Sequence, residues 1–315
     1  TISPPRLNPV TVTDTSGSPI TGVVALSANL ANTFALKGDG TVWAWGWNGN
    51  GELGDGTRTD RPNSVAVTDG NGSPITGVVA VAPGAYYTVV LKDDGTVLAW
   101  GGNNSGQLGD GTTTGQPNPV TVKDESGTPI NGVVALTAGY RHTVALKSDG
   151  TVLAWGENNS GQLGIGSIAT TNLQRTISLH PLEVQDLKGK PTGVVAVASG
   201  IYHLNAALKS DGTVWTWSNS RNFRNRSIAV SLKDASGSPV TGALALAVGG
   251  DHTAALMDDG TVLAWGYNYS GQLGDGTTTD RLNPEAVEDE SGIPINGVVA
   301  LAAGGDYTLA LKNDG

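Results

Sequence analysis

Residues 91–112 read Leu-Lys-Asp-Asp-Gly-Thr-Val-Leu-Ala-Trp-Gly-Gly-Asn-Asn-Ser-Gly-Gln-Leu-Gly-Asp-Gly-Thr. The dipeptide Asp94-Gly95 separates two runs, Tyr87–Leu91 and Thr96–Trp100, whose residues alternate as they do in β-strands. Asp-Gly readily adopts the positive φ angles of a tight hairpin turn. The stretch therefore predicts a two-stranded hairpin followed by a glycine-rich loop.

This hairpin recurs along the whole chain. Its copies are Leu36–Trp45, Leu146–Trp155, Leu208–Trp217 and Leu256–Trp265, and a first half returns at Leu311–Gly315. Six copies of one supersecondary unit indicate a repeat fold. Glycine contributes 46 of the 315 residues, but it falls at fixed places in each copy and therefore indicates turns instead of disorder.

A second recurring feature is an apolar strand of the type Gly-Val-Val-Ala, and its first glycine marks the start of each unit. These glycines are Gly22, Gly77, Gly132, Gly193, Gly242 and Gly297. Units of about 55 residues with about four short strands and no helical period predict an all-β fold, a β-propeller of six blade units. A β-solenoid is the alternative, although its coils are usually shorter. Because stacked repeats share their cores, we expect residues 1–315 to form a single domain.

The two ends of the chain suggest how the ring closes. Asn8–Thr21 matches Asn118–Asn131 and Asn283–Asn296 almost position for position, so the chain begins within a repeat. We expect residues 1–21 to supply the closing strand of the last blade, which the N-terminal and C-terminal strands would share. A complete last blade would also need a Thr-Val-x-Ala-Trp-Gly strand after Gly315. Since the first residue is not Met, we expect either a removed leader or a longer parent protein.

Charge and composition narrow the possible partners. The net charge is −10 with a pI near 4.7, which argues against nucleic acid and anionic membranes as partners. No apolar run approaches the length of about 18 residues that a membrane helix needs, so we expect no membrane insertion. The absence of cysteine excludes disulfides and thiol chemistry, and is in keeping with a secreted bacterial protein.

The full repeat reads Gly-x-x-His-Thr-x-Ala-Leu-Lys-x-Asp-Gly-Thr-Val-x-Ala-Trp-Gly-x-Asn-x-x-Gly-Gln-Leu-Gly-Asp-Gly-Thr, most clearly at Gly139–Gly164 and Gly249–Thr277. It resembles the regulator-of-chromosome-condensation repeat. The resemblance implies a propeller that usually has seven blades, so a seventh would lie outside these six units. It implies no single function, because the family includes a guanine-nucleotide exchange factor, a plant ultraviolet photoreceptor, ligase-associated domains and a secreted bacterial β-lactamase inhibitor.

The members of this family differ in features that can be compared with the chain. The photoreceptor type carries tryptophan in the Gly-x-x-His turn, where this chain has none. The exchange-factor type uses an inserted wedge, whereas the insertion Ile165–Leu182 is short. The inhibitor type binds its target through variable residues in the Gly-x-x-His turn and in the loop after Trp-Gly. That mode needs no motif, and it directs attention to the same two loops here.

Candidate binding residues therefore come from the variable loop positions. Aromatic side chains displayed on loops are costly to leave in water unless they bind a protein or the flat face of a sugar. With one neighbouring arginine, these positions are Trp47, Tyr86, Tyr140, Arg141, Tyr202, Tyr267 and Tyr269.

The fourth repeat supplies further candidates, because the stretch Ser218–Arg226 replaces its glycine-rich loop. Seven of the 18 lysines and arginines fall between Arg175 and Arg226. This indicates a patch for an anionic partner with Arg221, Phe223 and Arg224 as anchors. Drift of a tolerant loop is the alternative.

Other recurring residues are interpreted as structural. Tyr87, His142, His203, His252 and Tyr307 share one aromatic slot, with Asn32 as the exception, and we expect them to hold the same turn in each blade. Asp55, Asp110 and Asp275 invite a calcium site, but Asp-Gly-Thr is ordinary turn chemistry and the EF-hand spacing is missing. The tryptophans that repeat at one position are expected to pack in cores: Trp45, Trp100, Trp155, Trp217 and Trp265.

These observations favour a non-enzymatic recognition scaffold that binds a protein or glycan partner through rim loops, at a bacterial cell surface or outside the cell. No catalytic motif, cofactor motif or metal-ligand motif is found. The alternatives are an enzyme that acts on a polysaccharide or peptide at the mouth of the ring, and a structural module of a larger surface protein. The oligomeric state stays open.

Overall fold

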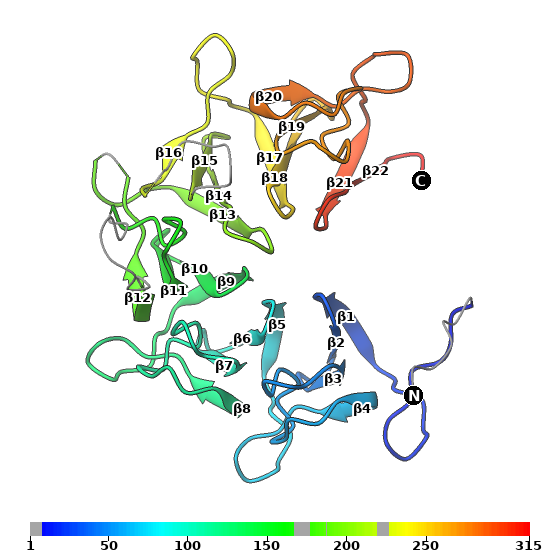
Figure 1. Ribbon diagram of the computed structural model, residues 1–315, viewed down its shortest axis with the longest axis vertical. Helices are drawn as coiled ribbons and strands as arrows, with labels where there is room; N and C mark the ends of the chain where they lie inside the picture. Colours follow the sequence, from blue (N-terminus) through cyan, green and yellow to red (C-terminus); the bar gives the residue numbers. More distant parts are fainter. Residues whose placement is uncertain (1–7, 167–176, 187, 219–226) are drawn as a thin grey trace.

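The computed structural model describes residues 8–166, 177–186, 188–218 and 227–315. In these ranges every element is a β-strand. The strands form five antiparallel sheets of four strands and one sheet of two. In Figure 1 the six sheets stand around a common centre, and the first strand of each sheet lies nearest to it. The predicted all-β propeller is confirmed, and we number its sheets as blades one to six in chain order.

Blades one to three have the same construction, in which consecutive strands are hydrogen-bonded neighbours. Blade one contains β1 (Val23–Ala28), β2 (Asn32–Lys37), β3 (Val42–Gly46) and β4 (Arg61–Ala66). Blade two contains β5 (Val78–Pro83), β6 (Tyr87–Lys92), β7 (Val97–Gly101) and β8 (Gln116–Thr121). Blade three contains β9 (Val133–Ala138), β10 (His142–Lys147), β11 (Val152–Glu157) and β12 (Ile177–Glu183).

Blades four and five repeat this order, and blade six has two strands. Blade four contains β13 (Val194–Ser199), β14 (Asn205–Lys209), β15 (Val214–Trp217) and β16 (Val230–Ser231). Blade five contains β17 (Ala243–Val248), β18 (His252–Met257), β19 (Val262–Gly266) and β20 (Arg281–Ala286). Blade six contains β21 (Val298–Ala303) and β22 (Thr308–Lys312).

The predicted hairpin turn joins β6 to β7. Gly95 has a φ of 78° and donates its N–H to the carbonyl of Lys92 at 3.0 Å. The Asp94 carboxylate accepts from the backbone N–H of Thr96 at 2.9 Å and from its hydroxyl at 2.6 Å. The predicted hairpin turn is thus formed, but only Gly95 of the pair has a positive φ. Asp94 contributes in a different way, because its carboxylate accepts from the N–H two residues further on.

The apolar core lies between neighbouring blades. Between blades two and three, Leu108 of the loop after β7 and Trp155 of β11 are both fully buried. Leu53, Leu163 and Leu273 take the place of Leu108 in the cores between blades one and two, three and four, and five and six. The tryptophans pack as predicted except for Trp45, which is half-buried because no described blade precedes it.

Hydrogen bonds join the blades beside these cores. The carbonyl oxygen of Gln107 in blade two accepts from Trp155 Nε1 at 2.9 Å and from Thr143 Oγ1 at 3.2 Å in blade three. Between blades one and two, the carbonyl of Glu52 accepts in the same way from Trp100 and Thr88. Between blades three and four, the carbonyl of Gln162 accepts from Trp217 and Asn205. One main-chain oxygen thus connects each of these blades to two side chains of the next.

The first described segment lies beside blade one and does not complete blade six (Figure 1). Asp14 forms a parallel bridge with Ser64 of β4, and Asn63 Nδ2 donates to the carbonyl of Asp14 at 3.0 Å. Asn118 makes the same contact from blade two to the carbonyls of Thr68 and Asp69. Asp14 therefore lies against blade one as Thr68 and Asp69, which follow the outer strand of blade one, lie against blade two. The expected blade shared by both chain ends is not formed by the described residues, in which β22 pairs only with β21.

Within the described ranges the structure contains no helix that is long and apolar enough to cross a membrane. The second residue of each first strand is apolar and exposed, and these strands are the ones nearest to the centre of the ring in Figure 1. These residues are Val24, Val79, Val134, Val195, Leu244 and Val299.

Candidate functional site

Four predicted binding residues from blades one to three form a continuous group, here called the aromatic cluster: Trp47, Tyr86, Tyr140 and Arg141. The rings of Trp47 and Tyr86 meet edge-on with centroids 6.3 Å apart. The rings of Tyr86 and Tyr140 meet in the same way at 5.3 Å, and their hydroxyl oxygens lie 3.1 Å apart. The hydrogen bond to Tyr86 raises the pKa of Tyr140 above its ordinary value. Edge-to-face pairs of this kind are favourable arrangements of aromatic rings.

Arg141 is the cation of the aromatic cluster. Its guanidinium carbon lies 5.6 Å from the centroid of the Tyr86 ring and 5.4 Å from that of Tyr140. Both distances are within the range of a cation–π interaction, which holds the planar group against the rings. Neighbouring turns are also joined by main chain, since Ala85 donates its N–H to the carbonyl of Gly139. The repeat therefore places side chains from successive turns beside one another.

A pocket opens between the aromatic cluster and the loop of blade two. Besides Trp47, Tyr86 and Arg141, its lining consists of Asn50, Gly102, Asn104 and Gln107. It contains about 560 Å³ of atom-free space, part of which is open solvent.

Gly102 leaves room for this pocket. Gly102 directly follows the Trp-Gly pair of its blade. The residues at the same position in other blades are Trp47, Glu157 and Tyr267. Each of the four donates its backbone N–H to a carbonyl in the turn before the second strand of its blade. A side chain at Gly102 would approach Asn50 and Tyr86. The lining residues combine aromatic surface, amides and a guanidinium group, and they include no carboxylate. This composition suits a ligand that offers apolar surface and hydrogen-bond acceptors.

The remaining aromatic candidates lie apart from this group. Tyr267 and Tyr269 stack on each other in blade five, with centroids 6.4 Å apart and an interplanar angle of 22°. Tyr269 is 76% exposed. The Tyr202 ring covers Gly250 of blade five, where an added Cβ would lie 2.9 Å from it. Arg221, Phe223 and Arg224 fall outside the described residues.

The aromatic slot has a structural role, as predicted, in blades two, three and five. Tyr87 donates its hydroxyl to the carbonyl of His142 in the next blade. Nε2 of the fully buried His142 lies 2.8 Å from Asn205 Oδ1, and Nε2 of His252 lies 2.8 Å from Thr308 Oγ1. Burial lowers the pKa of His142 to about 4.

The assignment of His203 to this slot is wrong, because Leu204 occupies it. In the regular turns the glycine N–H donates to the carbonyl of the residue in the slot, as Gly139 does to His142. In blade four the N–H of Gly200 donates to the carbonyl of Leu204 at 2.9 Å, which places Leu204 in the slot. The turn of blade four contains one extra residue, which displaces His203 to a half-buried position 3.2 Å from Gln162 Nε2. Burial lowers the pKa of His203, while Glu157 and Asp251 act in the opposite direction.

The aspartates of the Asp-Gly-Thr loops fold those loops. The Asp275 carboxylate accepts from Asn268 Nδ2 at 2.9 Å and from Arg281 Nε at 2.6 Å. Asp55 has the same two kinds of partner, Asn48 and Arg61, at 3.1 and 2.7 Å. Among the described residues, no three His, Asp or Glu side chains are grouped so that they could hold a metal ion.

Sequence reasoning missed the polar lining of the pocket, namely Asn50, Gly102, Asn104 and Gln107. The signal was present at Gly102, which departs from the large side chains at the same position in other repeats. Nothing in the local sequence indicates that Asn50 of blade one faces this glycine of blade two.

Six sheets around one centre, with loop residues of several blades gathered into one group, define a repeat β-propeller with a candidate binding face. A family model described as RCC1-like domain matches residues 2–315. The chain therefore belongs to the RCC1-like repeat family, as the resemblance indicated.

Known relatives extend beyond the matched region. The ultraviolet-B receptor UVR8 of Arabidopsis thaliana is 30% identical over 302 residues, which are 93% of this chain and 63% of the relative. The E3 ubiquitin-protein ligase HERC2 of Homo sapiens is 30% identical over 293 residues, which are 91% of this chain and 6% of the ligase. The chain thus spans less than two thirds of the length of these curated relatives.

Solved structures share the fold at lower identity. Human WBSCR16 superimposes with a TM-score of 0.74 at 23% identity, covering 96% of this chain and 78% of that one. Prp20p from Saccharomyces cerevisiae gives a TM-score of 0.60 at 18% identity, covering 93% and 83%. Its structure was determined together with its binding properties to Gsp1p and histones. The RCC1-like propeller is a fold that commonly serves as a protein-binding scaffold.

Proposed function

We propose that this protein is a non-enzymatic recognition scaffold that binds a protein partner through the aromatic cluster. The observation that carries this proposal is the contact between Tyr86, Tyr140 and Arg141, because tyrosine, tryptophan and arginine are the residues that most often dominate binding energy in protein interfaces. Rings that are already held by neighbouring rings and by hydrogen bonds lose little conformational freedom when a partner binds.

The partner proposed here is a protein and not a glycan. Support comes from the fold, which commonly binds proteins, and from Prp20p, for which Gsp1p and histones were studied as ligands. The aromatic cluster also holds its cation against two rings, so a partner with an acidic or carbonyl group beside an apolar one would match both features. The placement at a bacterial surface or outside the cell stays a prediction.

The test compares two variants of the intact chain. Partners are captured from the native environment, identified by mass spectrometry, purified, and titrated by calorimetry. We expect Tyr86→Ala with Tyr140→Ala to weaken binding at least about tenfold, which is typical of the loss of anchor residues. Tyr269→Ala is the matched control, because this exposed tyrosine lies in blade five outside the cluster, and it should change affinity less than about twofold.

An unchanged affinity of the double variant, with circular dichroism showing an intact fold, would contradict the proposal. A glycan array probed with the same variants covers the other class of partner. Binding of a glycan that depends on Tyr86 and Tyr140, without a protein partner, would replace the proposed function with sugar recognition.

A further inference from the structure

The glycine-rich loop of blade one departs from the other copies at two linked positions. Three other blades carry Ser-Gly-Gln in this loop, at residues 105–107, 160–162 and 270–272, whereas blade one carries Asn-Gly-Glu at residues 50–52. In the regular loops the serine N–H donates to the glutamine Oε1, as Ser105 does to Gln107 at 2.9 Å. In blade one, Glu52 accepts from the N–H of Asn50 at 2.9 Å and also from Asn50 Nδ2 at 2.7 Å. Glu52 therefore holds the Asn50 side chain in one orientation.

This orientation gives the pocket beside the aromatic cluster a hydrogen-bond acceptor. Because Nδ2 of Asn50 is bound by Glu52, the amide atom that stays available is Oδ1, which has no partner among the described residues. Asn50 lines the pocket and faces blade two, where a Cβ added to Gly102 would lie 3.6 Å from that of Asn50. Glu52 itself is fully buried and does not line the pocket.

Two donors line the same pocket without an acceptor. Only 2% of Gln107 is exposed, and its Oε1 accepts from Ser105, but no described residue bonds its Nε2. The same atom of blade three, Gln162 Nε2, lies 3.2 Å from His203 in the turn of the next blade. The turn that follows Gln107 in this way carries Arg141, whose guanidinium packs on two rings and has no ion pair in the described part of the chain. A nearly buried donor without a partner is costly, which indicates that an acceptor of a ligand belongs here.

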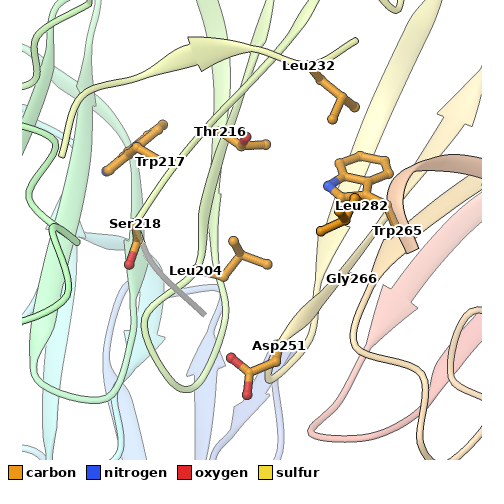
Figure 2. Close-up of a pocket in the computed structure, with 9 residues that line it drawn as sticks. All are labelled: Leu204, Thr216, Trp217, Ser218, Leu232, Asp251, Trp265, Gly266 and Leu282. Atoms are coloured by element: carbon orange, nitrogen blue, oxygen red, sulfur yellow. The ribbon is translucent and has the colours of Figure 1, made fainter. Parts of the chain in front are cut away.

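The positive charge is not a general feature of the spaces between blades. Figure 2 shows a pocket between blades four and five, where Leu204, Trp265 and the carboxylate of Asp251 contribute to the lining. The described lining of that pocket includes no cation, whereas the pocket beside the aromatic cluster has a guanidinium and no carboxylate. In a protein with a net charge of −10, this local charge favours an anionic group as the ligand.

The pocket is large enough for a side chain. Water can enter about 270 Å³ of it, many times the roughly 15 Å³ that one water molecule requires.

We propose that this pocket binds the C-terminal residue of a partner polypeptide. The α-carboxylate of that residue accepts from Arg141 and from Gln107 Nε2, and its backbone N–H donates to Asn50 Oδ1. Its side chain, which is apolar or aromatic, packs against the rings of Trp47 and Tyr86. This inference rests on the proposed function, because the terminal residue belongs to the partner that the aromatic cluster binds.

A terminal residue matches the pocket better than an aspartate or glutamate within a chain. It carries a carboxylate, an N–H and a side chain on one Cα atom, so a single residue supplies the acceptor, the donor and the apolar surface. An internal acidic residue uses its side chain for the carboxylate and has no apolar group left for the rings.

The first experiment uses the intact chain with ¹⁵N-labelled indoles and three synthetic peptides. Trp47→Phe identifies the indole signal of Trp47, which lines the pocket. We expect Ac-Gly-Ser-Gly-Phe-OH to shift this signal in a saturable manner, with a dissociation constant of about 0.1–1 mM, which is ordinary for a short peptide. The C-terminal amide of the same peptide should bind at least about tenfold more weakly, because it has lost its charge. Ac-Gly-Asp-Gly-Phe-NH₂, which moves the carboxylate into the chain, should be weakened as much.

The second experiment closes the pocket. Gly102→Tyr introduces the residue that blade five carries at the same position, Tyr267, and the other blades show that the fold accepts large side chains there. The variant should bind the free-acid peptide at least about tenfold more weakly. Its melting temperature should not fall.

The third experiment tests the acceptor. Asn50→Ser with Glu52→Gln restores the loop sequence of three other blades, and it should weaken the free-acid peptide several-fold. An ester analogue, in which oxygen replaces the N–H of the terminal residue, should bind the wild-type protein several-fold more weakly. The double variant should not distinguish the ester from the amide-linked peptide, since it has lost the acceptor that the N–H needs.

Three results would overturn the proposal. The first is an unshifted Trp47 signal at about 5 mM free-acid peptide, well above the expected dissociation constant. The second is binding of the C-terminal amide or of the internal-aspartate peptide as tight as that of the free acid. The third is wild-type affinity of Gly102→Tyr for the free-acid peptide.

The captured partner separates this inference from the proposed function. Removal of its last residue should weaken binding at least about tenfold. If the shortened partner binds with full affinity while Tyr86→Ala with Tyr140→Ala weakens it, this inference is wrong and the proposed function stands. If the free-acid peptide binds as expected but the captured partner is insensitive to Tyr86 and Tyr140, the proposed function is wrong and the terminal-residue pocket stands.

Discussion

Trp155 Nε1 of blade three donates a 2.9 Å hydrogen bond to the carbonyl of Gln107, which lies 48 residues earlier in blade two. Trp265 holds the same position in blade five without such an acceptor among the described residues. We expect Trp155→Phe to lower the free energy of unfolding by about 1 kcal/mol more than Trp265→Phe does, because only the former breaks a buried hydrogen bond. Urea denaturation of both variants measures the difference. Equal losses would show that ring packing alone determines the effect.

His142 makes stability depend on pH. Asn205 Oδ1 accepts from Nε2, and the buried Nδ1 has no hydrogen-bond partner, so its protonation would create an N–H donor without an acceptor. Burial accordingly lowers the pKa to about 4 from an ordinary value of 6.5. Between these values the unfolded chain binds more protons than the folded one. The stabilisation is therefore complete above about pH 6.5 and is lost as the pH falls toward 4, on the order of 3 kcal/mol in total.

The measurement is the free energy of unfolding at pH 7, 6, 5 and 4. His142→Tyr is the matched variant, since Tyr87 occupies the same slot in blade two. In this variant the slope of the free energy of unfolding against pH should decrease by the equivalent of about one bound proton. Part of the pH dependence should remain, because the pKa values of His203 and His252 are also lowered. A variant with the wild-type slope would show that His142 is not the group that titrates.

The Asp-Gly-Thr loops differ in one ion pair. Arg281 donates to the Asp275 carboxylate at 2.6 Å, and only 5% of the Asp275 side chain is exposed. Arg281 is the strand partner of Gly266 in blade five, whereas the corresponding strand partner of Gly101 in blade two is Gln116, which carries no charge. Burial alone would raise the pKa of Asp275, but hydrogen bonds from Arg281 and Thr277 outweigh it and the pKa is lowered. Asp275→Asn should lower the free energy of unfolding, measured by chemical denaturation, by about 1 kcal/mol more than Asp110→Asn does. Equal costs would mean that Arg281 contributes nothing measurable.

Ser218 carries backbone strain. Its φ is 94°, a left-handed conformation that costs a non-glycine residue about 1–2 kcal/mol. Ser218→Gly should therefore stabilise the protein by about 1 kcal/mol and raise its melting temperature. Ser218→Ala is the control, since it keeps the strain and loses the 3.2 Å hydrogen bond to the Ser160 carbonyl, so it should destabilise. If glycine lowered the melting temperature as alanine does, the hydrogen bond would outweigh the strain.

Features determined by neighbouring residues could be predicted from the sequence. The Asp94-Gly95 turn and the buried position of Trp100 follow from local conformation and from the alternation of side chains along one strand. The register of the fourth turn could not, because both His203 and Leu204 follow Gly200 at plausible distances and only the hydrogen bond from Gly200 to Leu204 distinguishes them.

The binding face was predictable in part. The variable positions pointed to Trp47, Tyr86, Tyr140 and Arg141, but their contacts join residues 39 to 55 positions apart in sequence, such as Trp47 with Tyr86. The stacking of blades determines which turns meet, and a single sequence does not contain that information.

The longer turn of blade four constrains how this repeat can have evolved. At Gly156 of blade three, a Cβ would lie 2.4 Å from the carbonyl oxygen of Arg141, so a regular turn excludes every residue except glycine there. Blade four has Ser218 at that position, together with a turn that is one residue longer. The two changes are thus epistatic. If the turn is lengthened first, glycine remains acceptable at this position. If glycine is replaced first, the new side chain clashes with the turn. The mutational path without a clash therefore begins with the insertion.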